Sequence, residues 1–286
     1  MMEVELKNRV LVVTVNYKSA LTTLEFLDSL SRANGFSEVA VVVADNSSGE
    51  EDLSGVRQAI AQLPNVELLV SAVNRGYFGA AKFTLDHYLA QGRALPDWVI
   101  VCNHDIVIED ERFFEKLFAC DPAMVGVLAP RIIIPSQAVE QNPFMKKRPG
   151  WWRRFTMRLY SFAYPLGVTW DWLSRQKKAL RSRMPSWISR PERNGGRQSI
   201  YAAHGAFMIF SRSFFEGGGK LDDQLFLFGE EIAVAETCRS LDLPIIYEPS
   251  LSVHHNEHQS VGNGMSRRIY GYHRAAVQHV LSKYFT

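Results

Sequence analysis

Cysteine is scarce in this sequence, and the few cysteines present form no recognisable pattern. Cys102, Cys120 and Cys238 are an odd number of widely spaced residues that match neither a disulfide framework nor a zinc-ligand spacing. A reduced compartment suits such a chain best. Long apolar stretches are missing as well: no window offers about 18 uninterrupted apolar residues, and the first ten residues lack the apolar core of a signal peptide. We therefore expect a protein of the cytoplasm with no membrane-spanning helix.

Two glycine-rich phosphate-binding motifs are also absent. The first strongly apolar run, residues 9–17, leads into "NYKSALTT", so no GxGxxG segment follows it to bring backbone amides up to a pyrophosphate. The P-loop pattern does not occur either. These absences argue against a nicotinamide-binding Rossmann domain and against a P-loop enzyme. A nucleotide bound by this chain would have to be held by side chains and a metal ion.

What the sequence does contain is a regular alternation of strand-like and helix-like segments. Runs such as "RVLVVTVNY" are typical of strands buried on both faces of a parallel sheet, and segments with apolar residues at helical spacing separate them. This alternation predicts an α/β fold, with a mostly parallel central sheet flanked by helices. We expect strands at 9–17, 38–48, 66–76, 97–105, 125–135, 201–210 and 244–255, and helices at 22–34, 50–62, 79–92, 111–120, 230–242 and 265–285.

Charge and tryptophan are distributed unevenly along the chain. Residues 144–190 contain twelve Lys and Arg residues against one acid, Asp171, although the net charge of the whole chain is only +2. Five of the six tryptophans lie there too. Such a segment would bind nucleic acid, or it would bind a membrane surface through anionic lipid heads and interfacial tryptophans. The density of tryptophan favours an anionic membrane surface as the partner of this segment, and we expect it to bind no nucleic acid. Packing of this segment on the main domain or on a second subunit stays open.

Polar side chains follow four of the expected strands at the point where each strand ends. The carboxyl ends of parallel strands meet at one edge of the sheet, where ligands of open α/β sheets bind. We therefore expect these side chains to form one site. They are Asn16 and Tyr17, Asp45 and Asn46, Asn74, Arg75 and Gly76, and Asn103, His104 and Asp105.

In their order and spacing, these segments resemble the inverting GT-A glycosyltransferases of family 2, in particular the rhamnosyltransferase-like branch. The resemblance rests on "VVTVNYKS", "VVADNSS", "NRGYFGAAKF", "VCNHDIVI", "HGAFMIFSRSFF", "LDDQLFLFGEE" and "SLSVHHNEHQS". It spans nearly the whole chain apart from residues 144–190. It implies a GT-A fold and the transfer of a sugar from a nucleoside diphosphate donor, here a dTDP- or UDP-sugar.

On this resemblance the chain is one GT-A domain over residues 1–286. Residues 1–135 would form the half that binds the nucleotide sugar, and 200–265 the half that binds the acceptor and carries the catalytic residues. Residues 144–190 would be a basic aromatic insertion close to the membrane, and 266–286 a C-terminal helix.

The resemblance assigns the strand-end residues to the donor. Asn16 with its neighbour Tyr17 and Asp45 would hold the base and ribose, because a carboxylate accepts hydrogen bonds from base N–H groups and ribose hydroxyls. Turn stabilisation is the alternative for Asp45. Gly76 would let the backbone approach the nucleotide and Arg75 would reach a phosphate, with a plain strand-to-helix turn as the alternative. The expected donor-binding residues are Asn16, Tyr17, Asp45, Asn74, Arg75, Gly76, Asn103 and His104.

The segment Asn103-His104-Asp105 resembles the DxD motif in its NxD variant. A divalent cation there would neutralise the growing charge on the departing diphosphate, and hard oxygen ligands suit Mg²⁺ or Mn²⁺. We expect Asp105 as the main ligand and Asn103 as a weaker or water-mediated one. "SVHHNEHQS" resembles a late segment whose histidine lies near the metal. The distance to Ser260 favours His255, with His254 as the alternative, and the glycines that follow at 262 and 264 suggest a mobile flap.

"FLFGEEIAV" resembles the segment that carries the family's catalytic base. An inverting transfer is a single displacement, so a carboxylate must take the proton of the attacking acceptor hydroxyl. The resemblance favours Glu231 as this base and Glu230 as the second candidate, while capping of a helix N-terminus is the alternative role for either. Ala233 stands where the family has a second Asp.

We therefore expect a metal-dependent inverting glycosyltransferase of cell-surface glycan synthesis. The first guess is rhamnose transfer from dTDP-rhamnose to a lipid-linked or polysaccharide acceptor, by an enzyme peripheral on the inner face of the cell membrane. The main alternative, suggested by Ala233 and by Glu in place of Asp, is a catalytically inactive GT-A domain serving as a membrane-associated assembly subunit. A sugar-nucleotide nucleotidyltransferase ranks last, because the glycine-rich loop after the first strand is missing. The exact sugar, the linkage and the oligomeric state are not encoded in such patterns.

Overall fold

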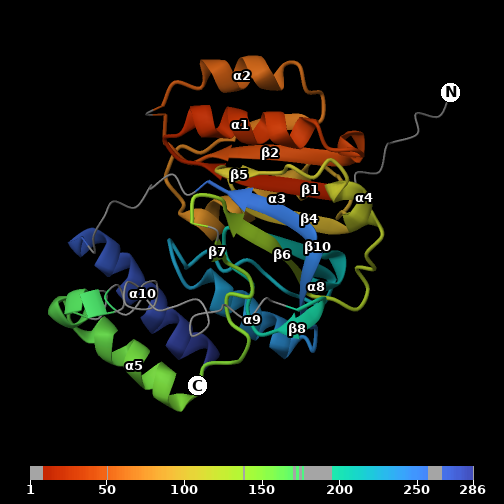
Figure 1. Cartoon of the computed structure of the whole chain (residues 1–286). Coiled ribbons are helices and arrows are strands. Elements are labelled where there is room, and N and C mark those ends of the chain that lie inside the picture. The colour runs from red at the N-terminus through yellow and green to blue at the C-terminus, as the bar shows by residue number, and fades with distance from the viewer. Residues whose placement is uncertain are drawn as a thin grey trace.

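A computed structural model describes residues 9–49, 51–137, 139–169, 172–173, 176, 195–256 and 266–285. Over these residues the predicted α/β alternation is confirmed (Figure 1). The strands are β1 (Val10–Asn16), β2 (Val39–Asp45), β3 (Val66–Val70), β4 (Trp98–Asn103), β5 (Ile106–Val107), β6 (Val127–Ile134), β7 (Val139–Glu140), β8 (Gln198–Ile200), β9 (Phe207–Ser211) and β10 (Ile245–His255). The helices are α1 (Ala20–Ser31), η1 (Phe36–Glu38), α2 (Ser54–Ile60), α3 (Tyr77–Ala90), α4 (Phe113–Phe118), α5 (Trp151–Phe162), α8 (Arg212–Glu216), α9 (Glu230–Ser240) and α10 (Arg267–Tyr284).

The central sheet has the order β3-β2-β1-β4-β9-β6-β10-β5, and off this path β7 pairs with β6 and β8 pairs with β10. The longer strands β1, β2, β3, β4, β6 and β10 all point in one direction, as expected for a mostly parallel sheet. β9 is the exception, because it runs antiparallel between β4 and β6. The largest differences from the expected strands are at two ends: β3 ends at Val70 rather than at residue 76, and β9 begins at Phe207 rather than at residue 201. The residues released from these strands form loops.

The register of the sheet brings the strand ends together. Asn16 at the end of β1 is paired with Asp45 at the end of β2, and Val15 is paired with Asn103 at the end of β4. Because β9 is antiparallel, its first residue lies at this same edge, and Asn103 donates its backbone N–H to the Ala206 carbonyl just before β9 (2.9 Å). The loop that precedes β9 therefore joins the carboxyl-terminal edge of the parallel strands.

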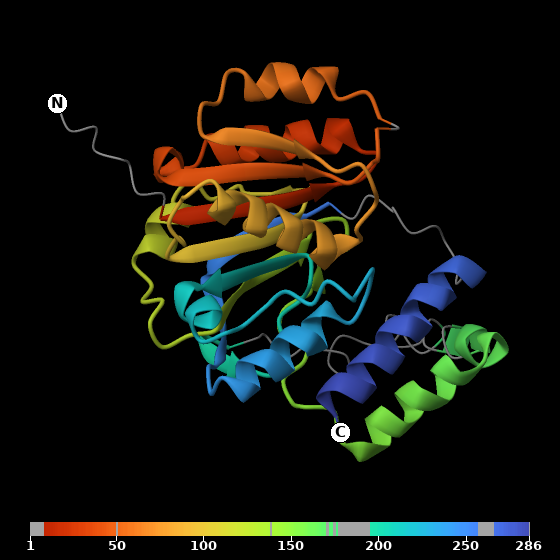
Figure 2. The ribbon, with the colours of Figure 1, turned by 180° about the vertical axis from the view of Figure 1, so that it is seen from behind.

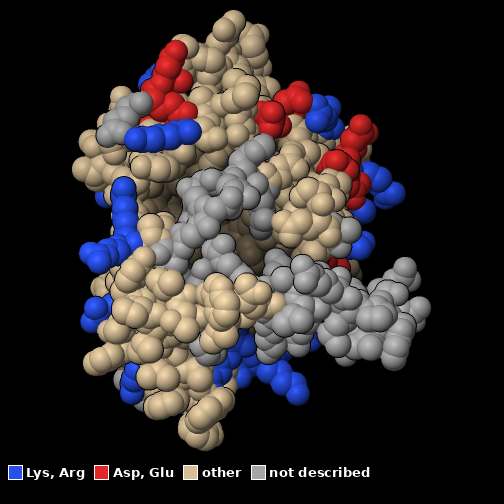
Figure 3. Space-filling model, turned by 60° about the vertical axis from the view of Figure 1, so that its left-hand side comes forward, with Lys and Arg blue, Asp and Glu red and all other residues tan. Residues whose placement is uncertain are grey.

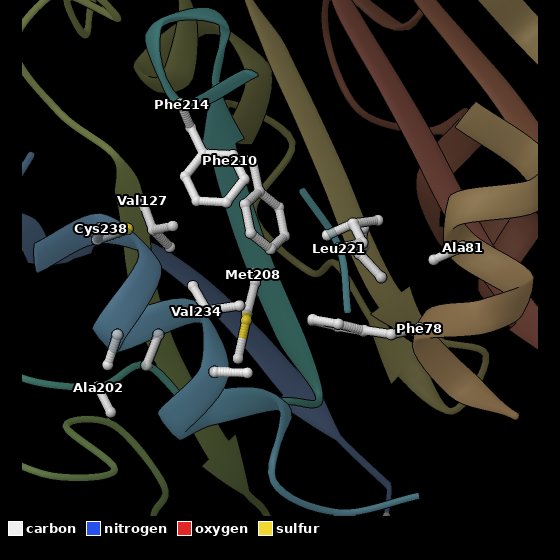
Figure 4. Close-up of a cluster of buried hydrophobic side chains, with 14 of the residues drawn as sticks. Phe78, Ala81, Val127, Ala202, Met208, Phe210, Phe214, Leu221, Val234 and Cys238 are labelled. Atoms are coloured by element: carbon white, nitrogen blue, oxygen red, sulfur yellow. The ribbon is translucent and has the colours of Figure 1, made fainter. Parts of the chain in front are cut away.

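Helices cover both faces of the sheet (Figures 1 and 2). α1 and α4 bury phenylalanine and leucine side chains against one face, and α3, α8 and α9 cover the other. Figure 4 shows the second of these cores, where Met208 and Phe210 of β9 lie between Phe78 of α3 and Val234 of α9. Each of these side chains is at most 2% exposed. Truncating a buried ring such as Phe210 to alanine would cost roughly 3–5 kcal/mol.

A helix pair stands beside this sandwich. α10 packs on α5, which belongs to the expected basic aromatic insertion, and on α9. Tyr270 of α10 donates a hydrogen bond from its hydroxyl to the Ser161 carbonyl (3.0 Å), and its ring meets Tyr164 edge-on. The described start of the insertion is therefore anchored to the C-terminal helix. Trp170, Asp171, Trp187 and most positions after 173 in that segment lie outside the described residues.

None of the helices in the described part of the chain combines the length and the hydropathy that crossing a bilayer requires.

A buried carboxylate ties α10 to the loop that leads into α9. Asp222 accepts hydrogen bonds at Oδ2 from His279 (2.7 Å), Lys283 (2.9 Å) and Tyr284 (2.8 Å). Burial acts to raise the pKa of Asp222, but these partners outweigh it and lower the pKa from its ordinary 3.8 to about 2. The charged form of Asp222 therefore stabilises the folded chain.

Asp222→Asn should lower the free energy of unfolding at pH 7 by about 1–3 kcal/mol, the size expected for hydrogen bonds to a charged group. The contribution of a group with a lowered pKa is present above its unfolded pKa and is lost as the pH falls through its folded pKa. The difference from the wild type should therefore shrink between pH 4 and pH 2, as measured by denaturant unfolding. Asp223→Asn is the matched control, because this exposed neighbour lies 3.8 Å from Lys82. An equal loss in both variants would contradict the assignment.

Candidate active site

The strand ends surround a cavity of about 470 Å³, which we call the strand-end cavity. Its wall contains residues from the ends of β1 and β4, the start of α3, the loop before β9, the first turn of α9 and the start of α10. Of the expected site residues it includes Tyr17, Asn74, Gly76, Asn103, His104, Asp105, Glu230 and Glu231. The segment before α3 and the segment before α9, which are about 150 residues apart in the chain, thus face one space.

Asp105 and His255 form a close pair beside this cavity. His255 Nε2 lies 3.2 Å from Asp105 Oδ1, and both side chains are buried. On the other side of the ring, His255 Nδ1 lies 2.7 Å from the Gln141 amide oxygen and donates to it. Burial acts to raise the pKa of Asp105, but the contact with His255 and the charges of His255 and His104 outweigh it, so this pKa lies below its ordinary value. Asp105 is therefore ionised at neutral pH.

This pair fits a divalent cation. With a metal ion bound, His255 would be neutral: Nδ1 would donate to Gln141, as it does here, and Nε2 would offer its lone pair to the ion beside the buried Oδ1 of Asp105. Two ligands at right angles around a Mg²⁺-sized ion lie roughly 3 Å apart, because each ligand distance is about 2.1 Å. The separation of 3.2 Å matches that spacing. No group of three or more His, Cys, Asp or Glu side chains suited to a metal occurs among the described residues, so further ligands would have to come from Asn103 and from the bound substrate.

His254, the alternative to His255, points to the other face of β10. Its Nδ1 lies 2.9 Å from the exposed carboxylate of Glu109, away from Asp105. Successive residues of a strand face opposite sides of the sheet, so only one of the two histidines can reach the cavity edge. The expected flap, with Ser260, Gly262 and Gly264, lies outside the described residues.

At the end of β2, Asn46 is part of the cavity wall, whereas Asp45, the residue expected to bind the donor, is buried. Asn46 donates to the Asn74 side chain (2.9 Å) and accepts from the backbone N–H of Arg75 (2.8 Å), which fixes the turn before α3. Asp45 is only 1% exposed and lies behind this wall, with Oδ2 buried and without a hydrogen-bond partner among the described residues. A donor-binding role for Asp45 stays a prediction.

Asn16 is directed at the protein and not at the cavity. Its amide nitrogen donates to Asp45 (2.9 Å) and to Glu51 (2.7 Å), and its oxygen accepts from Thr23 (3.0 Å). The side chain is fully buried. Asn16 therefore holds Asp45 in position, and its direct contact with a donor stays a prediction.

Arg75 and Gly76 of the "NRG" segment make contacts within the protein that the sequence did not predict. The guanidinium of Arg75 lies over the ring of Phe83 (4.2 Å), with Nε bonded to Ser71 (3.0 Å), in a separate depression of the surface. It does not reach the strand-end cavity, so a phosphate role for it is withdrawn. Gly76 is required by a contact that the sequence did not predict. At φ 73°, a Cβ on it would lie 2.2 Å from the Phe226 carbonyl oxygen, so glycine admits another loop of the protein. Gly76 also lines the strand-end cavity, and its approach to a nucleotide stays a prediction.

Glu230 and Glu231 begin α9 after a strained turn. Phe228 (φ 72°) and Gly229 (φ 88°) are both in the left-handed region, which for Phe228 costs roughly 1–3 kcal/mol and is typical of residues held for function. Burial raises the pKa of both glutamates, and the adjacent charge of Glu231 helps to raise that of Glu230 to about 8. At neutral pH Glu230 therefore holds its proton, and the pKa of Glu231 is raised from its ordinary value in the same direction.

The loop before β9 is in close contact with the side chain of Glu231. Glu231 Oε1 lies 3.4 Å from the backbone nitrogen of Gly205, and a Cβ at Gly205 would lie 3.0 Å from the same oxygen. On the other side of this loop, Tyr77 donates its hydroxyl hydrogen to the Gly205 carbonyl (2.9 Å). Glycine at 205 therefore allows the carboxylate and the backbone to meet, and Tyr77 holds the loop in place.

Sequence reasoning missed several residues of the wall. His204 is a neutral imidazole, because burial lowers its pKa to about 4, and its Nδ1 accepts from the Ala206 N–H (3.1 Å), which leaves the hydrogen on Nε2. Arg268 and Tyr272 reach the cavity from α10, where Tyr272 stacks on Phe226 at 4.6 Å. The quoted "HGAFMIF" segment and the cations of the last helix were the available signals. Neither says which cavity a side chain enters.

The profile of the family described as "Glycosyl transferase family 2" matches residues 10–218. The chain is 27% identical over 272 residues to the N-acetylglucosaminyl-diphospho-decaprenol L-rhamnosyltransferase of Mycobacterium tuberculosis. The aligned region covers 92% of this chain and 81% of that protein.

Two solved structures have a similar fold. The mannosyltransferase PcManGT from Pyrobaculum calidifontis, in complex with GDP-Man and Mn²⁺, has a TM-score of 0.50 and 15% identity, over 96% of this chain and 74% of that one. Residues 1–349 of S. aureus TarS, in complex with UDP, have a TM-score of 0.57 and 12% identity, over 97% of this chain and 67% of that one. At these identities the likeness concerns the fold alone.

Glu230→Gln should stabilise the protein more at pH 8 than at pH 5. Between the ordinary pKa of 4.5 and the raised value of about 8, the folded state holds a proton that the unfolded state has lost, so the stability of the wild type falls as the pH rises through this window. Glutamine carries no such penalty. The melting temperatures of both proteins at the two pH values measure the difference, with Glu25→Gln, exposed on α1, as the control. A pH-independent difference for Glu230→Gln would contradict the raised pKa.

Proposed function

This chain belongs to glycosyl transferase family 2, and we propose that it transfers a sugar from a nucleoside diphosphate donor in the strand-end cavity to an acceptor hydroxyl, with inversion at the anomeric carbon. One observation supports this most strongly: Asp105, which is paired with His255, borders the same cavity as Glu230 and Glu231. Asp105 and His255 would bind a cation that neutralises the charged leaving group, and one of the two glutamates would accept the proton of the acceptor hydroxyl. A single displacement needs both.

On the donor side, the chain's own residues would hold the diphosphate. Asp105 and His255, with Asn103, would bind a Mg²⁺ or Mn²⁺ ion that neutralises the negative charge of the departing nucleotide. Arg268 replaces Arg75 in our assignment of the phosphate contact, because its side chain lines this cavity. Tyr17, Asn74 and His104 are also on the wall and would contact the nucleotide.

On the acceptor side, Glu231 would take the proton of the attacking hydroxyl. A base in a buried site is most useful when its pKa lies near the working pH, and burial moves the pKa of Glu231 in that direction. Glu230, protonated at neutral pH, would donate a hydrogen bond and keep the negative charge on its neighbour.

The relative in Mycobacterium tuberculosis supports a specific donor and acceptor. Its name states the transfer of L-rhamnose to N-acetylglucosaminyl-diphospho-decaprenol. We propose dTDP-rhamnose as the donor and a lipid-linked glycan as the acceptor, in cell-surface glycan synthesis. Such an acceptor requires a membrane-proximal enzyme, peripheral on the inner face of the membrane, and the basic aromatic segment that includes α5 is the expected contact.

The alternative of an inactive assembly subunit has less support. Ala233, which replaces a second acidic residue, is buried among the core residues of α9 and is not on the wall of the strand-end cavity. A carboxylate at this position would face the core, so its absence removes nothing from the cavity. The two glutamates that do face the cavity are both present.

Asp105→Asn should abolish metal-dependent binding of the donor. With the wild type, dTDP or UDP plus Mn²⁺ should raise the melting temperature by several degrees at ligand concentrations about 100-fold above Kd. The variant should show no increment when Mn²⁺ is added. Glu109→Gln, which removes an exposed carboxylate on the opposite face of the strand pair, is the control. An unchanged metal increment in Asp105→Asn would refute this metal site.

Glu231→Gln should lower kcat about 100- to 10,000-fold, as expected for the loss of a general base, while nucleotide binding stays within about twofold. Glu230→Gln should keep at least about a tenth of the activity, since glutamine resembles the protonated form that Glu230 already has. Sugar transfer to a lipid-linked acceptor gives kcat, and calorimetry gives the affinity. If Glu230→Gln were the inactive variant and Glu231→Gln the active one, the two roles would be exchanged.

A further inference from the structure

A second cavity, of about 500 Å³, lies between α5, α9 and α10, and we call it the α5/α10 cavity. It shares His204, Phe228 and Glu231 with the strand-end cavity. Glu231 therefore stands at the junction of two separate spaces. Since the strand-end cavity holds the groups suited to a nucleotide diphosphate, a second molecule that must also reach Glu231 has the α5/α10 cavity available to it.

The chemistry of this cavity differs from that of the strand-end cavity. Much of its wall is apolar, and includes Met145, Met157, Ile232, Val277 and Val280. Apart from Glu231 at the junction, no Asp or Glu is among the described residues that line it. This wall suits a hydrocarbon, because the removal of apolar surface from water is favourable.

One permanently charged side chain lines the α5/α10 cavity, and it is a cation. Arg153 of α5, an exposed residue, is the one Lys or Arg among the described residues of the lining, and Thr156 and Tyr160 of the same helix also carry polar groups. His273, on α10, is neutral, because burial lowers its pKa. A ligand with an apolar body and an anionic group would therefore match this wall in both polarity and charge.

α5 links this cavity to the outer surface. Thr156, Met157 and Tyr160 contribute to the cavity wall. Trp152, Phe155, Leu159 and Phe162 follow one another at helical spacing and are between 51% and 75% exposed, so they form an apolar stripe on the solvent side. Figure 3 brings this side of the molecule forward: the lower lobe is mostly tan, with Lys and Arg side chains at its margins. A cavity for an amphipathic molecule thus lies under a helix whose outer surface suits a lipid interface.

We propose that the α5/α10 cavity binds the carrier end of a lipid-linked acceptor. Its phosphate would lie beside Arg153, its first isoprenoid-like carbons would lie against the apolar wall, and its sugar hydroxyl would reach Glu231. This inference rests on the proposed function only in that Glu231 is the base. The binding of the carrier itself can be measured without any sugar transfer.

Farnesyl diphosphate is a suitable probe, because it combines a short isoprenoid with a diphosphate. Calorimetry should detect its binding to the full chain in the presence of saturating dTDP or UDP and Mn²⁺. Thr156→Phe fills the cavity and should weaken this binding at least tenfold, with nucleotide affinity unchanged. Thr169→Phe is the matched control: Thr169 is exposed on a helical segment, and both threonine hydroxyls bond only to a carbonyl of their own helix. The control should bind the probe within twofold of the wild type.

Arg153→Met tests the anionic contact and leaves an exposed position little perturbed. It should weaken the binding of farnesyl diphosphate at least fivefold and leave farnesol unaffected. This variant keeps the assignment testable even if Thr156→Phe fails to fold. In transfer assays, both variants should raise the KM for the lipid-linked acceptor while hydrolysis of the donor in water continues at the wild-type rate.

Three outcomes would overturn the proposal. The first is displacement of farnesyl diphosphate by the nucleotide, which would locate the probe in the strand-end cavity. The second is equal binding by Thr156→Phe and Thr169→Phe together with no effect of Arg153→Met. The third is loss of binding in Phe155→Ser but not in Thr156→Phe, which would locate the probe on the exposed stripe. If the carrier probe binds as described but no nucleotide binds and no sugar is transferred, the cavity assignment stands and the proposed function fails.

Discussion

The structure depends on the register of the parallel strands at one edge of the sheet. Asn16 is paired with Asp45, and Val15 with Asn103, so the chain leaves β1, β2 and β4 at the same level. The antiparallel β9 adds the loop of His204 and Gly205 to this edge. A shift of one residue in any of these pairings would turn every side chain of that strand to the opposite face and would dismantle the site. The buried β-branched cores of the strands oppose such a shift.

The paired glutamates at the start of α9 show which of two opposing effects is larger. A helix N-terminus favours a carboxylate by about 0.3–1 kcal/mol, which lowers its pKa. Burial in a site of low polarity can raise the pKa of a carboxyl by as much as 3–5 units. The pKa values of Glu230 and Glu231 are both raised, so burial is the larger effect here. Capping of the helix was the alternative role for these residues, and it does not account for two carboxyls held in so unfavourable a position.

Sequence reasoning predicted the elements and most of the residues at the strand ends, because hydrophobic periodicity and strand polarity are local properties. Asn103 and Asp105 were expected from the end of β4, and Glu231, at the start of α9, was expected from the resemblance to family 2. It failed where the answer depends on contacts distant in sequence. Arg75 turns to Phe83 rather than to the cavity, and Gly76 is required by Phe226 from a loop 150 residues away. The antiparallel direction of β9 and the part played by α10 in the wall likewise depend on packing, which a strand or helix pattern does not specify.

One further consequence arises from the position of α10. Its first turns, with Arg268 and Tyr272, border the strand-end cavity, and Ala276 and Val277 border the α5/α10 cavity. Its last turn is hydrogen-bonded to Asp222. The helix α10 therefore forms part of the wall of both cavities. A ligand in one cavity that tilts α10 would change the volume of the other cavity, and the effect of each ligand on the affinity for the other would then be equal. The binding affinity of each of two substrates that meet at Glu231 would then depend on the other through a shift of α10, even without direct contact between them.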